Sequence, residues 1–282
     1  MKKRPTESKT ENMVAKVRER YGRIAADAGS CCSTCAGAPL PPSTVLGYDR
    51  AELDLLPGSA DLGLGCGAPL AALDLAPGET VLDLGSGPGL DALLAGRRVG
   101  PGGHVIGVDM TPEMLQRARA AAKAAGAVNV EFRAGRLEEL PVDDASIDAV
   151  TSNCVINLVP DKAAVFLEMA RVLRPGGRAV ISDIVLDAPL PDAVRADVLA
   201  YVGCVAGAME RGPYFDLLRT AGLADIEVLR DIDYLGMVGD EVPAEIASLL
   251  ERTGVTIEQV RGRVRAVTYR ARPGDRAPRS IR

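Results

Sequence analysis

Histidine and tryptophan are almost absent from this chain of 282 residues, which contains one histidine, His104, and no tryptophan. His104 stands in a Pro-Gly-Gly-His turn just before an expected strand, where turn formation alone accounts for it. A Ser-His-Asp catalytic arrangement is therefore hard to build. We expect His104 to be a surface turn residue without a catalytic role.

The chain also lacks a strong net charge and any long apolar run. Its formal charge is −5, with no clustered basic face of the kind that binds nucleic acid. Residues 1–12 are polar and charged and precede no apolar stretch, so we expect no secretory signal. No segment approaches the roughly 20 apolar residues needed to cross a bilayer. With 47% hydrophobic and 25% charged residues, we expect a cytoplasmic globular protein with a sizeable core and no membrane partner.

One glycine-rich stretch, Thr80–Asp91, is typical of a ligand-binding α/β protein. Residues 81–84 have the composition of a short buried strand, and Gly85, Gly87 and Gly89 follow in a tight turn before an expected helix. Glycine in such a turn lets the backbone approach a ligand closely. A strand, a glycine-rich turn and a helix commonly begin a nucleotide-binding unit, although the turn alone is a weak signal.

From residue 79 onward, expected strands and helices alternate along the chain. Strands are expected at residues 81–84, 105–108, 130–133, 147–151, 179–185, 224–230 and 264–271. Helices are expected at residues 11–28, 90–98, 112–125, 161–173, 192–209, 214–221 and 243–252. This rhythm predicts an α/β fold with a doubly wound, mostly parallel sheet of seven strands and helices on both faces.

The same pattern suggests how the chain is divided. Residues 1–72 should form an N-terminal helix and a cysteine-bearing cap, and residues 73–271 the catalytic-type domain. Within that domain, residues 188–222 interrupt the alternation, and we expect a helical insertion over the active site. Residues 272–282 are basic and contain proline, which predicts a disordered tail.

Asp109 is the second sign of a nucleotide site. It ends the second expected strand, twenty residues after Gly89, the spacing at which an acidic residue reaches a ribose hydroxyl in doubly wound folds. A strand-end aspartate that only caps a helix is the plain alternative. Together with the glycine-rich turn, the ribose role is favoured, and both NAD and S-adenosylmethionine use this layout.

Three stretches distinguish between these cofactors. Val81–Gly89, Val108–Met110 and Leu173–Gly177 resemble the class I S-adenosylmethionine-dependent methyltransferases. The resemblance implies a Rossmann-like fold and S-adenosylmethionine as the cofactor.

The resemblance also assigns roles to single residues. Asp83 would hold the methionine end, Asp109 the ribose, and Met110 would pack on the adenine. After the third strand, many relatives carry aspartate directly after glycine, whereas this chain has Arg136, so the adenine-edge contacts pass to the next two residues. The residues that the resemblance assigns to the cofactor are Asp83, Gly85, Ser86, Gly87, Gly89, Asp109, Met110, Leu137, Glu138 and Asn153.

Cysteine is the residue type that indicates most about the substrate that would accept the methyl group. The six cysteines are Cys31, Cys32, Cys35, Cys66, Cys154 and Cys204. In a reducing compartment they serve more often as ligands, redox centres or core residues than in disulfides. Cys154 follows the fourth strand, at the edge where α/β sheets bind ligands, and Cys66 and Cys204 lie on segments able to reach it. Three soft thiolates suit a thiophilic centre.

Four stretches extend the resemblance to one family. Val17–Gly22 with the cysteines that follow it, Leu62–Gly67, Ser152–Leu158 and Tyr201–Ala208 resemble the bacterial arsenite methyltransferases over nearly the whole chain. By that resemblance, arsenic would be bound by Cys66, Cys154 and Cys204. The candidates for a further, assisting cysteine are Cys31, Cys32 and Cys35.

The chemistry implied by this family agrees with the scarcity of histidine. Trivalent arsenic attacks through a lone pair, so no proton must be removed by a general base. Methyl transfer would give formally pentavalent arsenic, which the family reduces again with cysteine thiols, leaving a disulfide for thioredoxin or glutathione to open. The products would be mono- and dimethylated arsenicals, formed for arsenic detoxification. Nothing in the sequence requires more than a monomer.

Two other functions stay open at this stage. A small-molecule C- or O-methyltransferase would keep the cofactor and use its cysteines structurally. A non-catalytic metalloid- or zinc-binding protein would use Cys31, Cys32 and Cys35, but a closed structural zinc site needs four ligands and this cluster supplies three.

Overall fold

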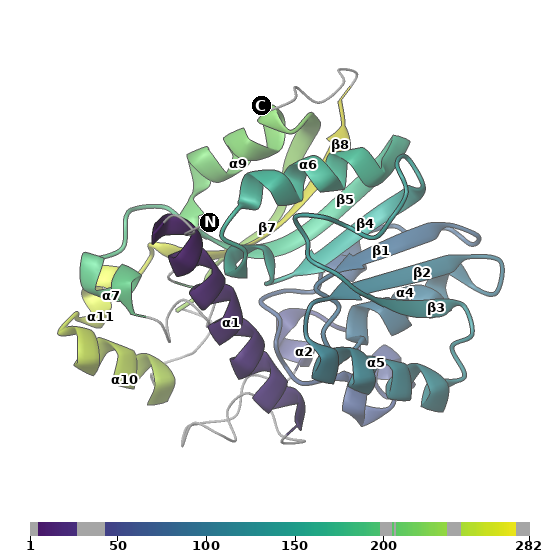
Figure 1. Cartoon of the computed structure of the whole chain (residues 1–282), viewed down its shortest axis with the longest axis horizontal. Helices are drawn as coiled ribbons and strands as arrows, with labels where there is room; N and C mark the ends of the chain where they lie inside the picture. The colour runs from purple at the N-terminus through teal and green to yellow at the C-terminus, as the bar shows by residue number, and fades with distance from the viewer. Residues whose placement is uncertain (1–4, 27–42, 198–204, 206, 236–243, 275–282) are drawn as a thin grey trace.

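The computed structural model describes residues 5–26, 43–197, 205, 207–235 and 244–274. A single twisted sheet crosses the middle of the molecule, with helices on both of its faces (Figure 1). The predictions made for Cys31, Cys32, Cys35, Cys204 and residues 275–282 of the expected tail lie outside the described residues. The start of that tail, residues 272 and 273, is instead the end of the last strand.

The sheet confirms the predicted fold class. Its main strands are β1 (Thr80–Leu84), β2 (His104–Asp109), β3 (Val130–Ala134), β4 (Ile147–Asn153), β5 (Leu173–Leu186), β7 (Leu223–Asp233) and β8 (Val264–Pro273). They lie in the order β3-β2-β1-β4-β5-β8-β7. In this order β8 runs in the opposite direction to the other six strands. A two-residue strand, β6 (Met209–Glu210), adds to the end of β5.

Helices and short 3₁₀ turns fill the connections. The helices are α1 (Pro5–Ala26), α2 (Ser43–Leu46), α3 (Arg50–Leu53), α4 (Leu90–Val99), α5 (Pro112–Ala125), α6 (Lys162–Val172), α7 (Asp192–Ala196), α9 (Arg211–Thr220), α10 (Ala244–Thr253) and α11 (Ile257–Val260). The 3₁₀ turns are η1 (Gly58–Ala60), η2 (Pro69–Ala72) and η3 (Ile156–Leu158). Proline at the first position of α5 and Gly126 after its end explain the bounds of that helix.

The core has two layers because successive side chains of a strand point to opposite faces of the sheet. Val81 of β1 packs in the layer that contains α4, whereas Leu82 packs in the layer that contains α6 and α9. Both side chains are fully buried. Strands buried on both faces read as continuous apolar runs, which is why β1 was recognisable in the sequence.

The chain changes direction across the sheet beside β1. From β1 it proceeds outward through β2 and β3, then crosses back to form β4 on the other side of β1. Leu84 therefore pairs with Val108 of β2 and with Ser152 of β4. In open α/β sheets, the crevice at such a reversal is where ligands bind.

Within the predicted helical insertion at 188–222, the structure describes residues 188–197, 205 and 207–222, which are only partly helical. Residues 211–220 form α9, which packs on α6, β5 and β7 and buries Tyr214 and Leu218 in the main core. This part covers the sheet rather than the site. The expected helix at 192–209 is also wrong at its end, since Met209 and Glu210 form β6. A helix-like spacing of apolar residues cannot tell which surface they will cover.

A buried polar network lies behind the end of β5. The carboxylate of Asp183 accepts hydrogen bonds from Asn157 Nδ2 at 2.9 Å, Tyr214 Oη at 2.9 Å and the Ile184 amide at 3.0 Å. Burial raises the pKa of Asp183 to about 7, against these hydrogen bonds and the charge of Lys162. Asp183 is therefore substantially protonated near neutral pH.

This network predicts a pH-dependent stability difference for Asp183→Asn. In the wild type, the unfolded carboxyl ionises above its ordinary pKa of 3.8 while the folded one stays neutral until about pH 7. Wild-type stability from this group is thus full below the lower pKa and is lost as pH rises. The free energy of unfolding of the variant, relative to the wild type, should rise by on the order of 2–4 kcal/mol between pH 4 and pH 8.

Urea unfolding across this pH range measures the difference. The control is Asp216→Asn on the exposed side of α9, which should run parallel to the wild type. A wild-type-to-variant difference for Asp183→Asn that does not change with pH would show that Asp183 is ionised in the folded protein.

Candidate active site

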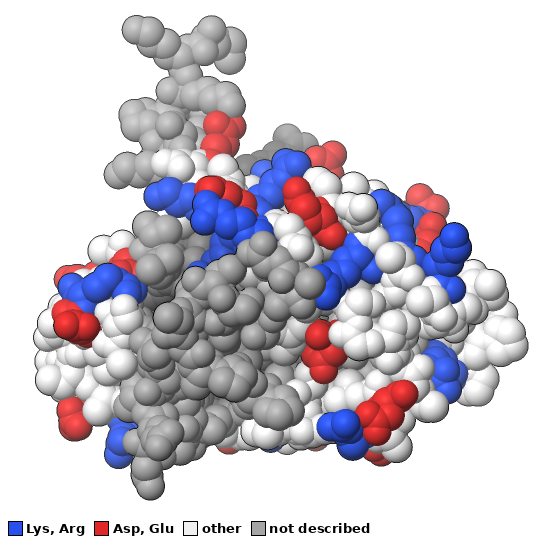
Figure 2. All heavy atoms as spheres, turned by 90° about the horizontal axis from the view of Figure 1, so that it is seen from below, with Lys and Arg blue, Asp and Glu red and all other residues white. Residues whose placement is uncertain are grey.

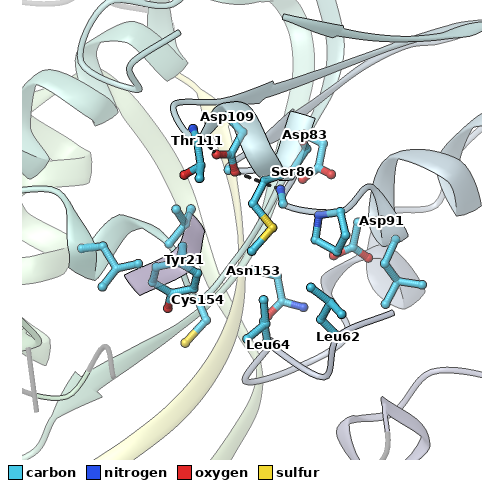
Figure 3. A pocket seen from close by; sticks show the side chains of 18 of the residues that line it. Tyr21, Leu62, Leu64, Asp83, Ser86, Asp91, Asp109, Thr111, Asn153 and Cys154 are labelled. Carbon is cyan, nitrogen blue, oxygen red and sulfur yellow. Dashed lines mark hydrogen bonds between the residues drawn. The ribbon is translucent and has the colours of Figure 1, made fainter. Parts of the chain in front are cut away.

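A pocket opens at the carboxyl ends of β1, β2 and β4, the place that the chain reversal predicts. Its lining combines the turn after β1, the loop after β3 and three residues of α1 (Val14, Val17 and Tyr21). Figure 3 shows Asp83, Asp91 and Asp109 on one side of this pocket and Cys154, beside Tyr21, on the other. The site therefore has an acidic part and a part that carries a thiol.

The glycine-rich turn is shaped by contacts that only glycine permits. Gly85 has a φ of +69°, and a Cβ atom there would lie 2.4 Å from Cγ2 of Val155. The amides of Gly85 and Ser86 both donate to the Val108 carbonyl, at 2.8 and 3.0 Å. The turn is thus held against the end of β2 on one side and against the residue after Cys154 on the other.

Asp109 secures the turn from the end of β2. Its carboxylate accepts hydrogen bonds from the Gly87 amide at 3.0 Å and from the Thr111 amide at 2.8 Å. Desolvation raises the pKa of Asp109, against these backbone hydrogen bonds. Asp109 thus ties the glycine-rich turn to the start of α5.

Asp83 is a buried carboxyl group of the pocket that lacks a full set of hydrogen-bond partners among the described residues. It is buried, its Oδ2 has no hydrogen-bond partner within the part of the chain that the structure describes, and the Oγ of Ser86 has none either. Burial, together with the charges of Asp91 and Asp109, raises the pKa of Asp83 well above its usual value. A cation in the pocket would relieve this repulsion and fill the unused acceptor.

Asp91 and Tyr48 form a second buried contact in the wall. The Tyr48 hydroxyl donates to the Asp91 carboxylate, 2.9 Å from each of its oxygens. Burial raises the pKa of Asp91 to about 6, with the hydrogen bond from Tyr48 opposing it. Neither residue was singled out from the sequence, since Tyr48 comes from the N-terminal segment and nothing local links it to α4.

The two cysteines among the described residues belong to one apolar cluster. Cys66 and Cys154 are both buried and neither is in a disulfide, and they pack in a cluster with Val17 and Leu158. Cys154 follows β4 with a left-handed backbone, φ +59°, and its amide donates to the Ser182 carbonyl at 2.8 Å. A non-glycine residue in that conformation is rare and is often found at functional sites.

Most residues predicted from the resemblance to class I methyltransferases line the pocket, as Cys154 also does. Those that do are Asp83, Gly85, Ser86, Gly87, Asp109, Met110, Leu137, Glu138 and Asn153. Gly89 does not: it starts α4 with a φ of +99°, and a Cβ there would lie 2.9 Å from Cζ of Phe132. Gly89 thus serves helix packing. Cys66 lies just behind the lining residue Gly65, inside the apolar cluster.

The adenine-edge residues differ in environment. Leu137 is buried, whereas Glu138 forms an ion pair with Arg136 at 2.6 Å. Arg136, which stands where many relatives carry aspartate, thus neutralises the charge of Glu138. Sequence reasoning missed the contribution of α1 to the pocket, although the Val17–Gly22 stretch was the signal that could have revealed it.

The described residues offer neither a metal-binding cluster nor a membrane-spanning helix. Among the residues that the structure describes, no group of three or more His, Cys, Asp or Glu side chains could hold a metal ion. Likewise, none of the described helices is long and apolar enough to cross a membrane.

Comparison with known proteins gives the class of this chain. The methyltransferase-domain family matches residues 75–235. The arsenite methyltransferase of Halobacterium salinarum is 49% identical over 224 residues, covering 75% of this chain and 57% of that protein. That of Aquipseudomonas alcaligenes is 42% identical over 150 residues, covering 51% and 43%. This chain thus spans about half the length of these two curated relatives. It belongs to the methyltransferase-domain family.

A solved structure narrows the family. The crystal structure of an arsenic(III) S-adenosylmethionine methyltransferase from Chlamydomonas reinhardtii is 32% identical with a TM-score of 0.58, covering 86% of this chain and 76% of that one. Within the methyltransferases, this chain is a member of the arsenite methyltransferase family. The predicted resemblance is confirmed.

The pocket fits S-adenosylmethionine, the cofactor of this family. The unpartnered Oδ2 of Asp83 and the acidic surroundings suit the cationic methionine end, and the glycine turn leaves room for close backbone approach. We propose that Asp83 contacts the methionine end and that Asp109 accepts a ribose hydroxyl.

Asp83→Asn should weaken S-adenosylmethionine binding by about 10- to 100-fold, because a hydrogen bond to a charged group is lost from a buried site. Calorimetry at pH 7.5 measures the Kd. Asp144→Asn, an exposed acid outside the pocket, is the control and should bind as the wild type does. Equal Kd values for Asp83→Asn and the wild type would remove Asp83 from the cofactor site.

Proposed function

We propose that this protein transfers a methyl group from S-adenosylmethionine to trivalent arsenic held by cysteine thiolates. The observation that carries the proposal is the meeting of Cys66 and Cys154, from segments far apart in the sequence, in one apolar cluster beside the acidic pocket. The named relatives from Halobacterium and Chlamydomonas support arsenic as the acceptor.

A third thiolate would complete the arsenic site. Cys204 lies outside the described residues, but its sequence neighbour Val205 and the nearby Ala208 pack against the cluster that holds Cys66 and Cys154. This supports Cys204 as the third ligand. A dry apolar surround suits soft thiolates and keeps water from competing for arsenic.

The residues of the pocket have positioning roles in this reaction. S-Adenosylmethionine supplies an electrophilic methyl group on a sulfonium when it is bound. Asp83 and Asp91 would hold its cationic end, and Asp109 its ribose, so that the methyl group points toward the thiolate cluster. With the cofactor bound, the arsenic lone pair would form the As–C bond at the expense of the methyl–sulfur bond, with a neutral thioether as the other product. Alignment in a dry pocket is the main catalytic contribution.

No general base is needed, since no proton leaves arsenic. The single histidine is far from this chemistry: His104 opens β2, at the end of the strand opposite the pocket, and contacts Glu131 at 3.0 Å. His104 is the first residue of β2 with a half-exposed side chain, rather than the turn residue that the sequence predicted.

The methyl transfer raises arsenic formally to the pentavalent state, so reduction must follow. We propose that two cysteine thiols supply the two electrons and release two protons, forming a disulfide, with Cys31, Cys32 and Cys35 as candidate participants beside the arsenic ligands. Thioredoxin or glutathione would then open that disulfide by thiol exchange. We further propose that the enzyme is a monomer and acts in a reducing cytoplasm. Its products would be mono- and dimethylated arsenicals, formed for arsenic detoxification.

Each of Cys66→Ser, Cys154→Ser and Cys204→Ser should lower arsenite methylation by about 100-fold or more, because arsenic loses a ligand that places it in line with the methyl group. The assay contains arsenite, glutathione and labelled S-adenosylmethionine, with products separated by chromatography. S-Adenosylmethionine binding should persist in all three variants.

His104→Ala is the matched control and should retain the wild-type rate. Methylated arsenic absent from assays of the folded, reduced wild type would refute the proposed function. Full activity in a cysteine variant would exclude that cysteine as an arsenic ligand, and full activity in all three would show that these thiolates do not hold the arsenic.

A further inference from the structure

Cys66 is held in a narrow slot by its two glycine neighbours. A Cβ atom on Gly65 would lie 2.6 Å from Nδ2 of Asn153, and one on Gly67 would lie 2.6 Å from Oγ of Ser182. The Gly-Cys-Gly segment thus fits between the end of β4 and the surface of β5, with no space for side chains other than that of Cys66. Its glycines are explained by this close approach.

Asn153 binds this segment with both ends of its amide. Its Oδ1 accepts from the Cys66 amide at 3.0 Å, and its Nδ2 donates to the Gly67 carbonyl at 2.8 Å. The same Nδ2 donates to the Tyr48 hydroxyl at 2.8 Å. Both amide hydrogens are therefore committed to protein groups, which leaves one lone pair on Oδ1 for any other partner. These contacts favour a role in holding Cys66 over the cofactor contact predicted for Asn153.

Tyr48 extends the connection to the acidic side of the pocket. Its hydroxyl accepts from Asn153 and donates to Asp91, which lines the pocket. A continuous chain of buried hydrogen bonds therefore runs from Asp91 through Tyr48 and Asn153 to the backbone of Cys66. Hydrogen bonds in such a chain polarise one another, so a change in charge at Asp91 alters the bonds further along.

We propose that Asn153 is a positioning residue that sets the place of the Cys66 thiol, and that Tyr48 couples this place to occupancy of the donor pocket at Asp91. The proposal rests on and deepens the function proposed above, because it makes Cys66 the arsenic-binding thiolate whose position responds to the methyl donor. A cation bound at Asp91 engages the carboxylate that accepts the Tyr48 hydrogen bond, and the Cys66 segment adjusts through Asn153.

The first test measures how fast iodoacetamide alkylates Cys66 in the reduced full chain, followed on the Cys66 peptide by mass spectrometry. Asn153→Ala should be alkylated about tenfold faster than the wild type, since two hydrogen bonds that hold the buried segment are lost. Tyr269→Phe is the control: it removes a buried hydroxyl that bonds Tyr214 at 3.2 Å, away from the Cys66 segment. It should match the wild type.

If Asn153→Ala does not fold, Gly65→Ala tests the same point, because its methyl group would displace the Asn153 amide and should also accelerate alkylation. An alkylation rate equal to that of Tyr269→Phe, in whichever of the two variants folds, would overturn the positioning role. A readout beyond stability is the kinetic split: Asn153→Ala should raise the KM for arsenite by a larger factor than the KM for S-adenosylmethionine.

The second test adds S-adenosylmethionine to the alkylation assay. In the wild type it should slow alkylation at least about fivefold more than in Tyr48→Phe, in which the hydrogen-bonded link from Asp91 through Tyr48 is broken. Equal protection in both proteins would overturn the coupling. Alkylation does not depend on arsenic, so these results stand apart from the methylation assay, whose failure would overturn the proposed function alone.

Discussion

Both halves of the site depend on the parallel pairing of β1 with β4. Leu84 lies opposite Ser152 across this pair, so the glycine turn that follows β1 and the cysteine that follows β4 emerge at the same edge. The contact is direct, since Gly85 approaches Val155 so closely that a Cβ atom would clash. The glycine-rich turn and a thiol from a distant part of the sequence therefore become neighbours, because β1 and β4 pair in this register.

The two halves differ sharply in environment, which suits the chemistry proposed for them. On one side, Asp83, Asp91 and Asp109 crowd negative charge that a cationic donor would offset. On the other, Cys66 and Cys154 are surrounded by apolar side chains, as a soft acceptor centre requires. Asn153 and Tyr48 bridge these environments with buried hydrogen bonds.

The face seen in Figure 2 carries interspersed acidic and basic side chains around the described surface, without a single-sign patch.

The features predictable from sequence were those encoded locally. The apolar run at β1, the glycine turn and Asp109 at the end of β2 specify the donor site because strand, turn and spacing lie within thirty residues. Tyr48 and Asp91 could not be predicted, since only tertiary packing brings the N-terminal segment onto α4. The same limit explains α9, whose apolar spacing gave a helix but not the surface it covers.

The central claim is that cysteines from separate segments bind one arsenic atom beside the donor pocket. Arsenic K-edge X-ray absorption of the reduced protein, loaded with one equivalent of arsenite, tests it most directly. The account predicts a shell of three sulfur atoms around arsenic in the wild type, with sulfur lost from that shell in Cys66→Ser. A shell of oxygen atoms alone, or an unchanged sulfur shell in that variant, would contradict it.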